Sequence, residues 1–418
     1  MNHKVAIVRQ PPVYDSNQVR QSVQALGIDW RQLVRPGERV LLKPNFIRQS
    51  HTGRAHEWEQ IITHGTVIAA VAEEAAIALN GHGIITIADA PQTDSDFDAI
   101  SRLADLPALR DRLAQRWPDL KLEILDLRRE VWRTERGVIV ERHKLPEDPR
   151  GYTLVNLAGQ SRFHDKVSKL YGADYDSKFT QQHHAHGRHE YLLSRSAMDA
   201  DVFINLPKLK THKKVGITVS LKNLVGINGD KNYLPHFSIG TPDEGGDEFP
   251  TNAAKLKVQS KLITAFKAAA LKTGKTVQWW GPVAKKIGSK VFGDTATVVR
   301  SGNWHGNDTT WRMVLDLNLA FFARPRRYLS IVDGIIAGEG DGPMEADAKP
   351  CGVLIAGMNP VAVDYVCARL MGFDWQKIPM IREGFAQFGL SPDDVVADIG
   401  EPFHFKPHFG WKGHIETR

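Results

Sequence analysis

The chain has 418 residues, of which 42% are hydrophobic and 24% are charged, enough apolar material for a large globular body. Its two cysteines, Cys351 and Cys367, exclude a disulfide scaffold and a cysteine-ligated cluster, and they favour a reducing cytoplasm. The net charge of +6 has a local origin, because residues 253–293 contain nine lysines and no acidic residue. Neither an apolar leader nor a run of about 18 apolar residues occurs, so we expect a protein that is neither secreted nor membrane-spanning.

The predicted elements alternate strand, turn and helix along the chain. Residues 38–45 (ERVLLKPN) predict a buried strand, Thr63 is the predicted N-cap of a helix that ends near Leu79, and residues 83–91 predict the next strand. Further predicted elements are buried strands over 202–207, 328–334 and 351–360, and a helix over 361–371. Continuous apolar runs that alternate with helices are typical of a largely parallel sheet covered by helices.

We therefore predict an α/β fold, with a largely parallel mixed sheet and two lobes around a cleft. Residues 1–235 form the predicted N-terminal α/β lobe, residues 236–327 a lid loop with a basic helical insertion, and residues 328–418 a C-terminal α/β segment that completes the site. The lid prediction comes from residues 228–252, which are rich in glycine, proline and polar side chains, as functional loops often are.

A cluster of cationic and amide side chains follows the predicted strand 202–207. Within VFINLPKLKTHKKVGITVSLKNLVG (202–226), Lys208 and Lys210 share one face of an extended segment, and an apolar stretch surrounds Lys222 and Asn223. A solvated basic loop is the alternative. It is less favoured, because a lysine and an amide inside an apolar stretch need polar partners. The pattern predicts an anion-binding pocket.

Polar residues also follow the other predicted strands, at the edge where ligands of open α/β sheets bind. We expect this edge to gather two carboxylates, Asp89 and Asp333, with the substrate-binding side chains Lys43, Asn45, Asn205, Lys208, Lys210, Lys222, Asn223 and His236. Asp333 begins the glycine-rich segment VDGIIAGEGDGP, in which Glu339 and Asp341 add further carboxylate oxygens. These three residues predict a site for a divalent metal such as Mg²⁺ or Mn²⁺, or a clamp for substrate hydroxyls.

Histidines give further candidates for acid–base chemistry. His64 lies at the start of the first predicted helix, where the helix N-terminus lowers the pKa of an imidazole and favours a neutral base. His212 lies within the cationic cluster, and His236 lies in the predicted lid. The group His183, His184, His186 and His189 is either a metal-binding cluster or an exposed histidine-rich loop.

Residues 253–293 predict an amphipathic, lysine-rich helix that ends at Trp279–Trp280–Gly281–Pro282. Such a helix either lies in an anionic membrane interface or covers the protein's own core with a solvated lysine face. A nucleic-acid partner is not expected, because the basic segment lacks interleaved arginines and a reading motif.

Seven motifs occur in the order LLKPNF, ITHGTVIAAVAEE, IADAP, NLPKLKTH, SLKNLVGING, IVDGIIAGEGDGP and AGMNPVAVDYVCARLMGF. Over about residues 38–375 this series resembles the bacterial family catalogued as domain of unknown function 362. SGNWHGNDTTWRMVLDLN and FGWKGHIE resemble a longer branch of that family, associated with exopolysaccharide gene clusters. Some relatives carry a ferredoxin-like module with CxxCxxC motifs, which are absent here, so no iron–sulfur cluster is expected. ITHGT is distantly similar to the lactate racemase family.

These patterns predict a cytoplasmic enzyme, or one peripheral at the inner membrane face, that acts on an anionic sugar or a lipid-linked glycan precursor. His64, Asp89, His212 and Asp333 are the predicted catalytic residues. One alternative is a racemase or epimerase in which histidines flank the reacting carbon. Another is a non-catalytic glycan- or lipid-binding protein, in which Trp304, Trp311 and Trp411 stack on sugars.

Overall fold

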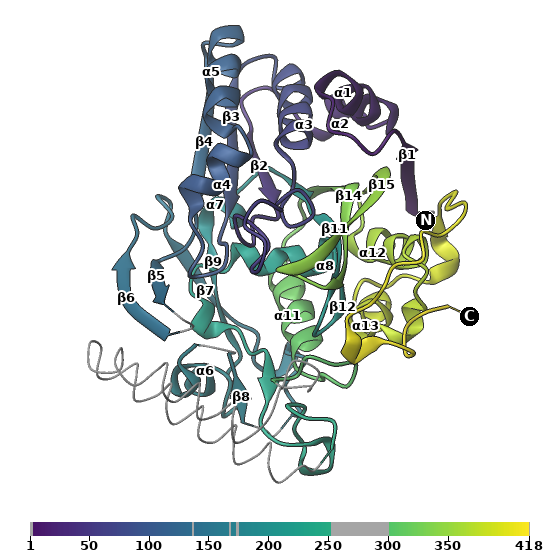
Figure 1. Ribbon diagram of the computed structural model, residues 1–418. Coiled ribbons are helices and arrows are strands. Elements are labelled where there is room, and N and C mark those ends of the chain that lie inside the picture. Colours follow the sequence, from purple (N-terminus) through teal and green to yellow (C-terminus); the bar gives the residue numbers. More distant parts are fainter. Residues whose placement is uncertain (1–2, 136–137, 167–168, 173–174, 252–300, 418) are drawn as a thin grey trace.

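The computed structural model describes residues 3–135, 138–166, 169–172, 175–251 and 301–417. Within these ranges one large sheet runs through the molecule, with the strand order β16-β1-β15-β14-β10-β2-β3-β4, and β11 and β12 extend it beside β14 (Figure 1). Its strands are β1 (His3–Arg9), β2 (Arg39–Pro44), β3 (Gly83–Asp89), β4 (Leu120–Asp126), β10 (Val202–Leu206), β11 (Lys208–His212), β12 (Gly216–Thr218), β14 (Arg327–Asp341), β15 (Glu345–Gly357) and β16 (Val395–Val396).

The centre of this sheet is parallel. Strands β4, β3, β2, β10 and β14 run in one direction, and Val202 of β10 pairs with Val40 on one side and Arg327 on the other. β15 is antiparallel to both β14 and β1, so the sheet is mixed. Strand β10, from the predicted N-terminal lobe (1–235), and strand β14, from the predicted C-terminal segment (328–418), are therefore neighbours in one sheet. The division into two lobes stays a prediction.

The central strands are buried on both faces, which explains their continuous apolar sequences. Leu41 belongs to the core on one face, whereas Val40 and Leu42 belong to the core on the other. Helices α1 (Ser16–Ala25), α2 (Trp30–Leu33), α3 (Gly65–Ala78), α4 (Phe97–Leu103) and α5 (Leu106–Arg116) pack on the Val40 face. Helices α8 (Ser220–Asn223), α11 (Thr310–Phe322), α12 (Pro360–Leu370) and α13 (Pro379–Gln387) pack on the Leu41 face. This α/β/α layering confirms the predicted fold class.

Smaller two-stranded sheets flank the main one: β5 (Glu130–Glu135) with β6 (Val138–Lys144), β7 (Tyr152–Asn156) with β9 (Glu190–Ser194), and β8 (Leu170–Tyr171) with β13 (Phe237–Ser238). None of the helices in the described ranges is long and apolar enough to cross a membrane. The amphipathic helix predicted over 253–293 lies outside the described residues.

Two predicted boundaries differ from the structure. Helix α3 begins after His64, whose Nδ1 accepts a hydrogen bond from Thr66 N (3.2 Å), whereas the hydroxyl of Thr63 donates to the Leu206 carbonyl (2.6 Å). The predicted strand 328–334 continues as β14 to Asp341, through glycines that favoured a loop. The longer strand forms because β11 and β15 provide backbone partners on both of its sides.

Candidate functional site

A cavity of about 290 Å³ opens at the carboxyl ends of β2 and β3. Its lining includes seven of the predicted site residues, namely Lys43, Asn45, Asp89, His212, Lys222, Asn223 and His236. Asp89 ends β3, and Lys43 lies one residue before the end of β2. The edge of the sheet at which ligands of α/β proteins bind is therefore the edge at which this cavity is found.

Lys43 and Asp89 form a buried ion pair in the cavity wall. Lys43 Nζ lies 2.7 Å from Asp89 Oδ1, and Asp89 Oδ2 accepts a 2.7 Å hydrogen bond from Phe46 N. Burial lowers the pKa of Lys43, and the charge of Asp89 partly offsets this effect. The pair requires a glycine at position 226, because a Cβ there would lie 1.9 Å from Asp89 Oδ1.

Three buried asparagines connect the strand ends to α8. Asn45 Nδ2 donates to Asn223 Oδ1 (3.0 Å), and Asn223 Nδ2 donates to Asn205 Oδ1 (2.7 Å). Lys210 Nζ donates to Asn45 Oδ1 (2.8 Å) and to the Ile61 carbonyl (2.5 Å). Asn205 and Lys210 do not line the cavity. They position residues that line it, and their predicted contact with substrate stays a prediction.

Helix α8 brings Lys222 and Asn223 to the cavity. Its first turn is held by Asp364 of α12, whose carboxylate accepts hydrogen bonds from Ser220 N (2.7 Å) and Leu221 N (3.2 Å). Lys222 is 9% exposed, and its ammonium has no hydrogen bond or ion pair among the described residues. Burial lowers the pKa of Lys222 to about 8.

The segment predicted as a lid contributes Lys231, Leu234 and His236 to the cavity. Lys231 Nζ donates to the Ala90 carbonyl (2.8 Å) and the Val225 carbonyl (3.2 Å). Burial lowers the pKa of Lys231 to about 7. Sequence reasoning missed this residue, although it is the only lysine of residues 228–252.

Lys213 and Lys214 also line the cavity and were not predicted as site residues. They follow His212 directly in THKKVG, so their position in the cationic cluster could have identified them as site residues. Lys214 Nζ contacts the Ser301 carbonyl and lies 5.5 Å from the ring centroid of Phe237. Asp89 is the single carboxylate among the described lining residues.

The two histidines of the cavity are held in different tautomers. His212 Nδ1 accepts a hydrogen bond from Lys214 N (3.0 Å), so the proton of the neutral ring is on Nε2. His236 Nδ1 donates to the Leu234 carbonyl (2.8 Å), so its Nε2 carries a lone pair. Burial and the charge of Lys222 lower both pKa values, that of His236 to about 3. The cavity thus holds one imidazole that can donate a hydrogen bond through Nε2 and one that can accept a hydrogen bond or a proton there.

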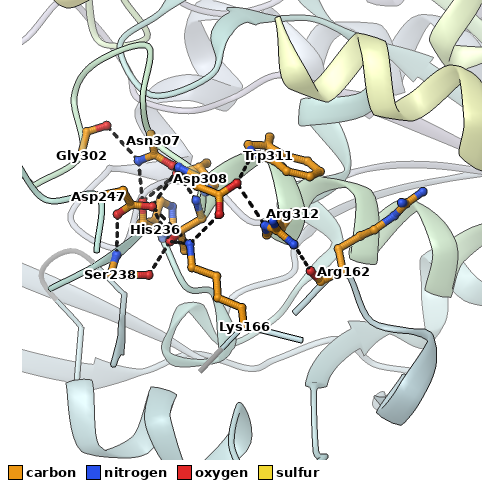
Figure 2. A network of polar contacts seen from close by, with 12 residues as sticks. Arg162, Lys166, His236, Ser238, Asp247, Gly302, Asn307, Asp308, Trp311 and Arg312 are labelled. Carbon is orange, nitrogen blue, oxygen red and sulfur yellow. Dashed lines mark hydrogen bonds and ion pairs between the residues drawn. The ribbon is translucent and has the colours of Figure 1, made fainter. Parts of the chain in front are cut away.

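The predicted lid is anchored to the start of α11 by a buried polar network (Figure 2). Asp247 accepts hydrogen bonds from Ser238 N (2.6 Å) and Asp308 N (2.9 Å). Asn307 Nδ2 donates to the carbonyl of His236 (3.0 Å). Burial raises the pKa of Asp247. These contacts fix the backbone that carries His236 into the cavity.

His64, Lys208 and Asp333 lie outside the cavity, in a second buried cluster with Tyr14. Lys208 Nζ donates to Asp333 Oδ2 (2.6 Å) and to Tyr14 Oη (2.8 Å), and Tyr14 Oη donates to Asp333 Oδ1 (2.9 Å). The ring of His64 stacks on Tyr14 at 3.6 Å between centroids, and its backbone N donates to Asp333 (2.9 Å). The prediction that Lys208 and Asp333 share a cavity with Lys43 is therefore wrong. The chain continues past Pro207 into β11, which pairs Lys208 with Asp333 of β14.

The predicted metal site is not assembled from Asp333, Glu339 and Asp341. These residues are spread along β14, where a rise of about 3.3 Å per residue separates the first from the last by more than about 20 Å. Glu339 accepts from Lys349 Nζ (3.0 Å), and Asp341 lies 3.8 Å from His408 Nε2. In the part of the chain that the structure describes, no group of three or more histidine, cysteine or acidic side chains could hold a metal ion.

The histidine-rich segment is neither an exposed loop throughout nor a metal cluster. His183 Nδ1 lies 2.5 Å from Glu190, and the buried His184 donates through Nε2 to the Tyr233 carbonyl (2.7 Å). Burial lowers the pKa values of His184 and His189, to about 3 and about 4. These histidines pack against aromatic rings and against the segment that carries Lys231.

The three tryptophans considered for sugar stacking are buried core residues. Trp304 Nε1 donates to the Asp247 carbonyl (2.9 Å), and Trp411 Nε1 donates to the Lys213 carbonyl (2.8 Å). Trp311 is 8% exposed and donates to Asp308 (3.1 Å). Their ring faces are therefore used for packing.

Comparison with known proteins gives a family and a relative. The sequence profile described as "Domain of unknown function (DUF362)" matches residues 158–369. "Thylakoid-associated protein sll1697" from Synechocystis sp. (strain ATCC 27184 / PCC 6803 / Kazusa) is 26% identical over 369 residues, which cover 88% of this chain and 73% of the relative. A crystal structure of a Thermotoga maritima protein is 11% identical, with a TM-score of 0.27, over 53% of this chain and 40% of that one.

Proposed function

The chain belongs to the family described as Domain of unknown function (DUF362), and from the chemistry of its cavity we propose that it is an enzyme acting on a small anionic substrate. The observation that carries this proposal is the charge of the described cavity lining. It includes Lys43, Lys213, Lys214, Lys222 and Lys231, against a single carboxylate, Asp89, that is already paired. Such an excess of lysines, all of them buried except the half-exposed Lys213, is stabilised by a bound anion.

The size of the cavity favours a small substrate or the head group of a larger one. Its volume of about 290 Å³ is at the lower end of the usual range for ligand sites. A phosphorylated or carboxylated sugar, or the anionic end of a lipid-linked glycan precursor, matches this size and charge. The resemblance to the branch associated with exopolysaccharide gene clusters favours a role in surface polysaccharide biosynthesis.

The proposed chemistry is proton transfer on the bound anion. His236 has a lone pair on Nε2 and acts as the base, and His212 carries its proton on Nε2 and polarises the substrate by donating a hydrogen bond. A bound anion would raise the pKa of both rings, because it opposes the charge of Lys222. No step requires a metal ion, and none is assigned to one.

A second candidate function is racemisation or epimerisation. The specific observation in its favour is that His212 and His236, with opposite tautomers, line the same cavity. When a bound anion raises the pKa of one ring enough to protonate it, the neutral ring could remove a proton from one face of a carbon and the protonated ring could return one to the other face. Exchange of substrate hydrogen for solvent deuterium, with inversion at one centre, would distinguish this reaction.

For location, we propose a cytoplasmic protein that associates reversibly with an anionic membrane. The support is the excess of lysine in residues 253–293 and the printed name of the Synechocystis relative, which describes that protein as thylakoid-associated. The lysines would attract the negative surface of the membrane.

Calorimetric titration with sulfate tests the anion site directly. Lys222→Ala should weaken binding about tenfold or more, since charge-assisted hydrogen bonds contribute about 1.5–3 kcal/mol. The matched control is Lys144→Ala, which removes an exposed lysine of β6 and should leave affinity unchanged. Absence of sulfate binding by the wild-type protein, or equal affinities for the two variants, would overturn the proposed function.

A further inference from the structure

The buried lysines around the cavity differ in whether the ammonium has a partner. Lys43 is paired with Asp89, and Lys231 donates to two backbone carbonyls. Lys210 is held by Asn45 and a carbonyl, and Lys214 contacts the Ser301 carbonyl. Lys222 has no partner among the described residues, although it is 9% exposed and lines the cavity. A buried ammonium without a partner is costly to the fold, which points to a use in function.

The surroundings of Lys222 make its ammonium easier to deprotonate than that of an exposed lysine. Burial lowers its pKa to about 8, so that about a tenth of the molecules carry a neutral amine at pH 7. In the described part of the chain no carboxylate is paired with Lys222, in contrast to Lys43 and its partner Asp89. A desolvated lysine amine near other cations is the type of nucleophile that forms Schiff bases with carbonyl substrates.

We propose that Lys222 is a catalytic nucleophile that forms an imine with an anionic carbonyl compound, that is, a phosphorylated or carboxylated aldehyde or ketone. This inference rests on the proposed function, because it names the substrate class for the same cavity. The lone pair of Lys222 Nζ attacks the carbonyl carbon, and the carbonyl oxygen takes up a proton to give a carbinolamine. Nζ then loses one proton, the hydroxyl takes up another and leaves as water, and a protonated carbon–nitrogen double bond forms, with one proton taken up overall. No oxidant or reductant is consumed.

Other residues of the cavity can assist the proton transfers and attract the charge of the substrate. The Nε2–H of His212 can donate a hydrogen bond to the carbonyl oxygen, and the lone pair of His236 Nε2 can accept the proton lost by Nζ and return it to the leaving hydroxyl. Lys213 and Lys214 remain to attract the phosphate or carboxylate group. Lys231 is a weaker candidate for the nucleophile, because it would have to leave its two carbonyl partners.

Borohydride trapping tests the inference. The protein is incubated with dihydroxyacetone phosphate or with pyruvate, reduced with borohydride, and mapped by peptide mass spectrometry. Imine formation should leave a secondary amine at Lys222, modified about tenfold more than any exposed lysine. Excess sulfate should suppress this adduct. Lys222→Arg should abolish it, since a guanidinium does not form the imine, and Lys144→Arg should not affect it.

The wild-type peptide map decides the outcome even if Lys222→Arg fails to fold, which circular dichroism would show. If neither probe modifies Lys222 while sulfate still binds, the imine inference is overturned and the proposed function stands. If the wild-type protein neither binds sulfate nor forms the adduct, both are overturned. Equal modification of Lys222 and exposed lysines also overturns the inference.

Discussion

At the scale of single residues, the close approach of Gly226 to the Lys43–Asp89 pair is the tightest constraint on the site. A Cβ at position 226 would lie 1.9 Å from Asp89 Oδ1 and 2.6 Å from Lys43 Nζ. Both side chains are almost fully buried, at 1% and 4% exposure, so neither can move without separating the pair. The glycine is required here for lack of space, and not for a left-handed backbone conformation.

We expect Gly226→Ala to destabilise the protein by about 3 kcal/mol, because breaking a buried ion pair leaves uncompensated charges. Urea denaturation would measure this. Gly53→Ala is the control, since the nearest atom to a Cβ there is 3.7 Å away. Equal stabilities for the two variants would show that the ion pair tolerates displacement.

Sulfate affinity should fall as pH rises from about 6 to about 9. Burial lowers the pKa values of Lys231 and Lys222 to about 7 and about 8, so both lose charge in this range while sulfate remains a dianion. Affinity should be highest below about pH 7 and decrease by up to about tenfold per pH unit for each lysine that must regain a proton. Titration calorimetry in buffers of different ionisation enthalpy should show proton uptake on binding. An affinity that is constant over this range would contradict these protonation states.

At the scale of elements, the short helix α8 depends on α12 for its position. Asp364 accepts the first two backbone N–H groups of α8, and burial raises its pKa to about 7. Asp364 does not line the cavity, so its effect on a ligand must pass through Lys222 and Asn223. It is a positioning residue.

Asp364→Ala should lower stability by about 2 kcal/mol and weaken sulfate binding, because two buried donors lose their acceptor. Asp364→Asn keeps one acceptor oxygen and should recover part of the affinity. Asp29→Ala is the matched control: Asp29 caps α2, a helix of the same four-residue length, and it should affect stability alone. If Asp364→Ala binds sulfate as tightly as Asp29→Ala does, α8 does not rely on this contact.

Helices and strands could be predicted where the local sequence pattern and the tertiary contacts favour the same secondary structure. The strand β2 and the helix α12 could be predicted from apolar runs and turn residues, because both are buried as the patterns require. The segment 335–341 could not, since its glycines favour a loop locally. This segment forms a strand because it pairs with β11, which is distant in sequence, and with β15, which follows it after a turn.

At the scale of the whole molecule, the rule that ligands bind at strand ends predicted where the cavity lies but not all of the residues that line it. Lys43 and Asp89 could be placed together because they lie at the ends of strands, whereas Asn223 reaches the cavity from helix α8. Lys208 was misplaced because β11 carries the chain beyond that edge. Lys231 enters from a long connection whose path is set by buried contacts such as those of Asp247, and a single sequence does not contain this information.

The proposed membrane association belongs to the whole molecule, because it depends on the charge of residues 253–293 relative to the rest of the chain. This segment carries nine lysines and no acidic residue, while the full chain has a net charge of only +6. Each lysine near an anionic surface contributes about 1 kcal/mol to attraction, and salt screens this effect.

Co-sedimentation with phosphatidylglycerol vesicles should therefore show binding at low salt that decreases as salt is added. Neutral phosphatidylcholine vesicles should not bind the protein. Changing Lys257, Lys261 and Lys272 to glutamate should abolish binding, since it reverses the charge within the basic segment. The same change at Lys121, Lys144 and Lys412, which are exposed elsewhere, controls for net charge alone. If wild-type protein stays in the supernatant at low salt, or if both triple variants lose binding equally, the basic segment is not the membrane anchor.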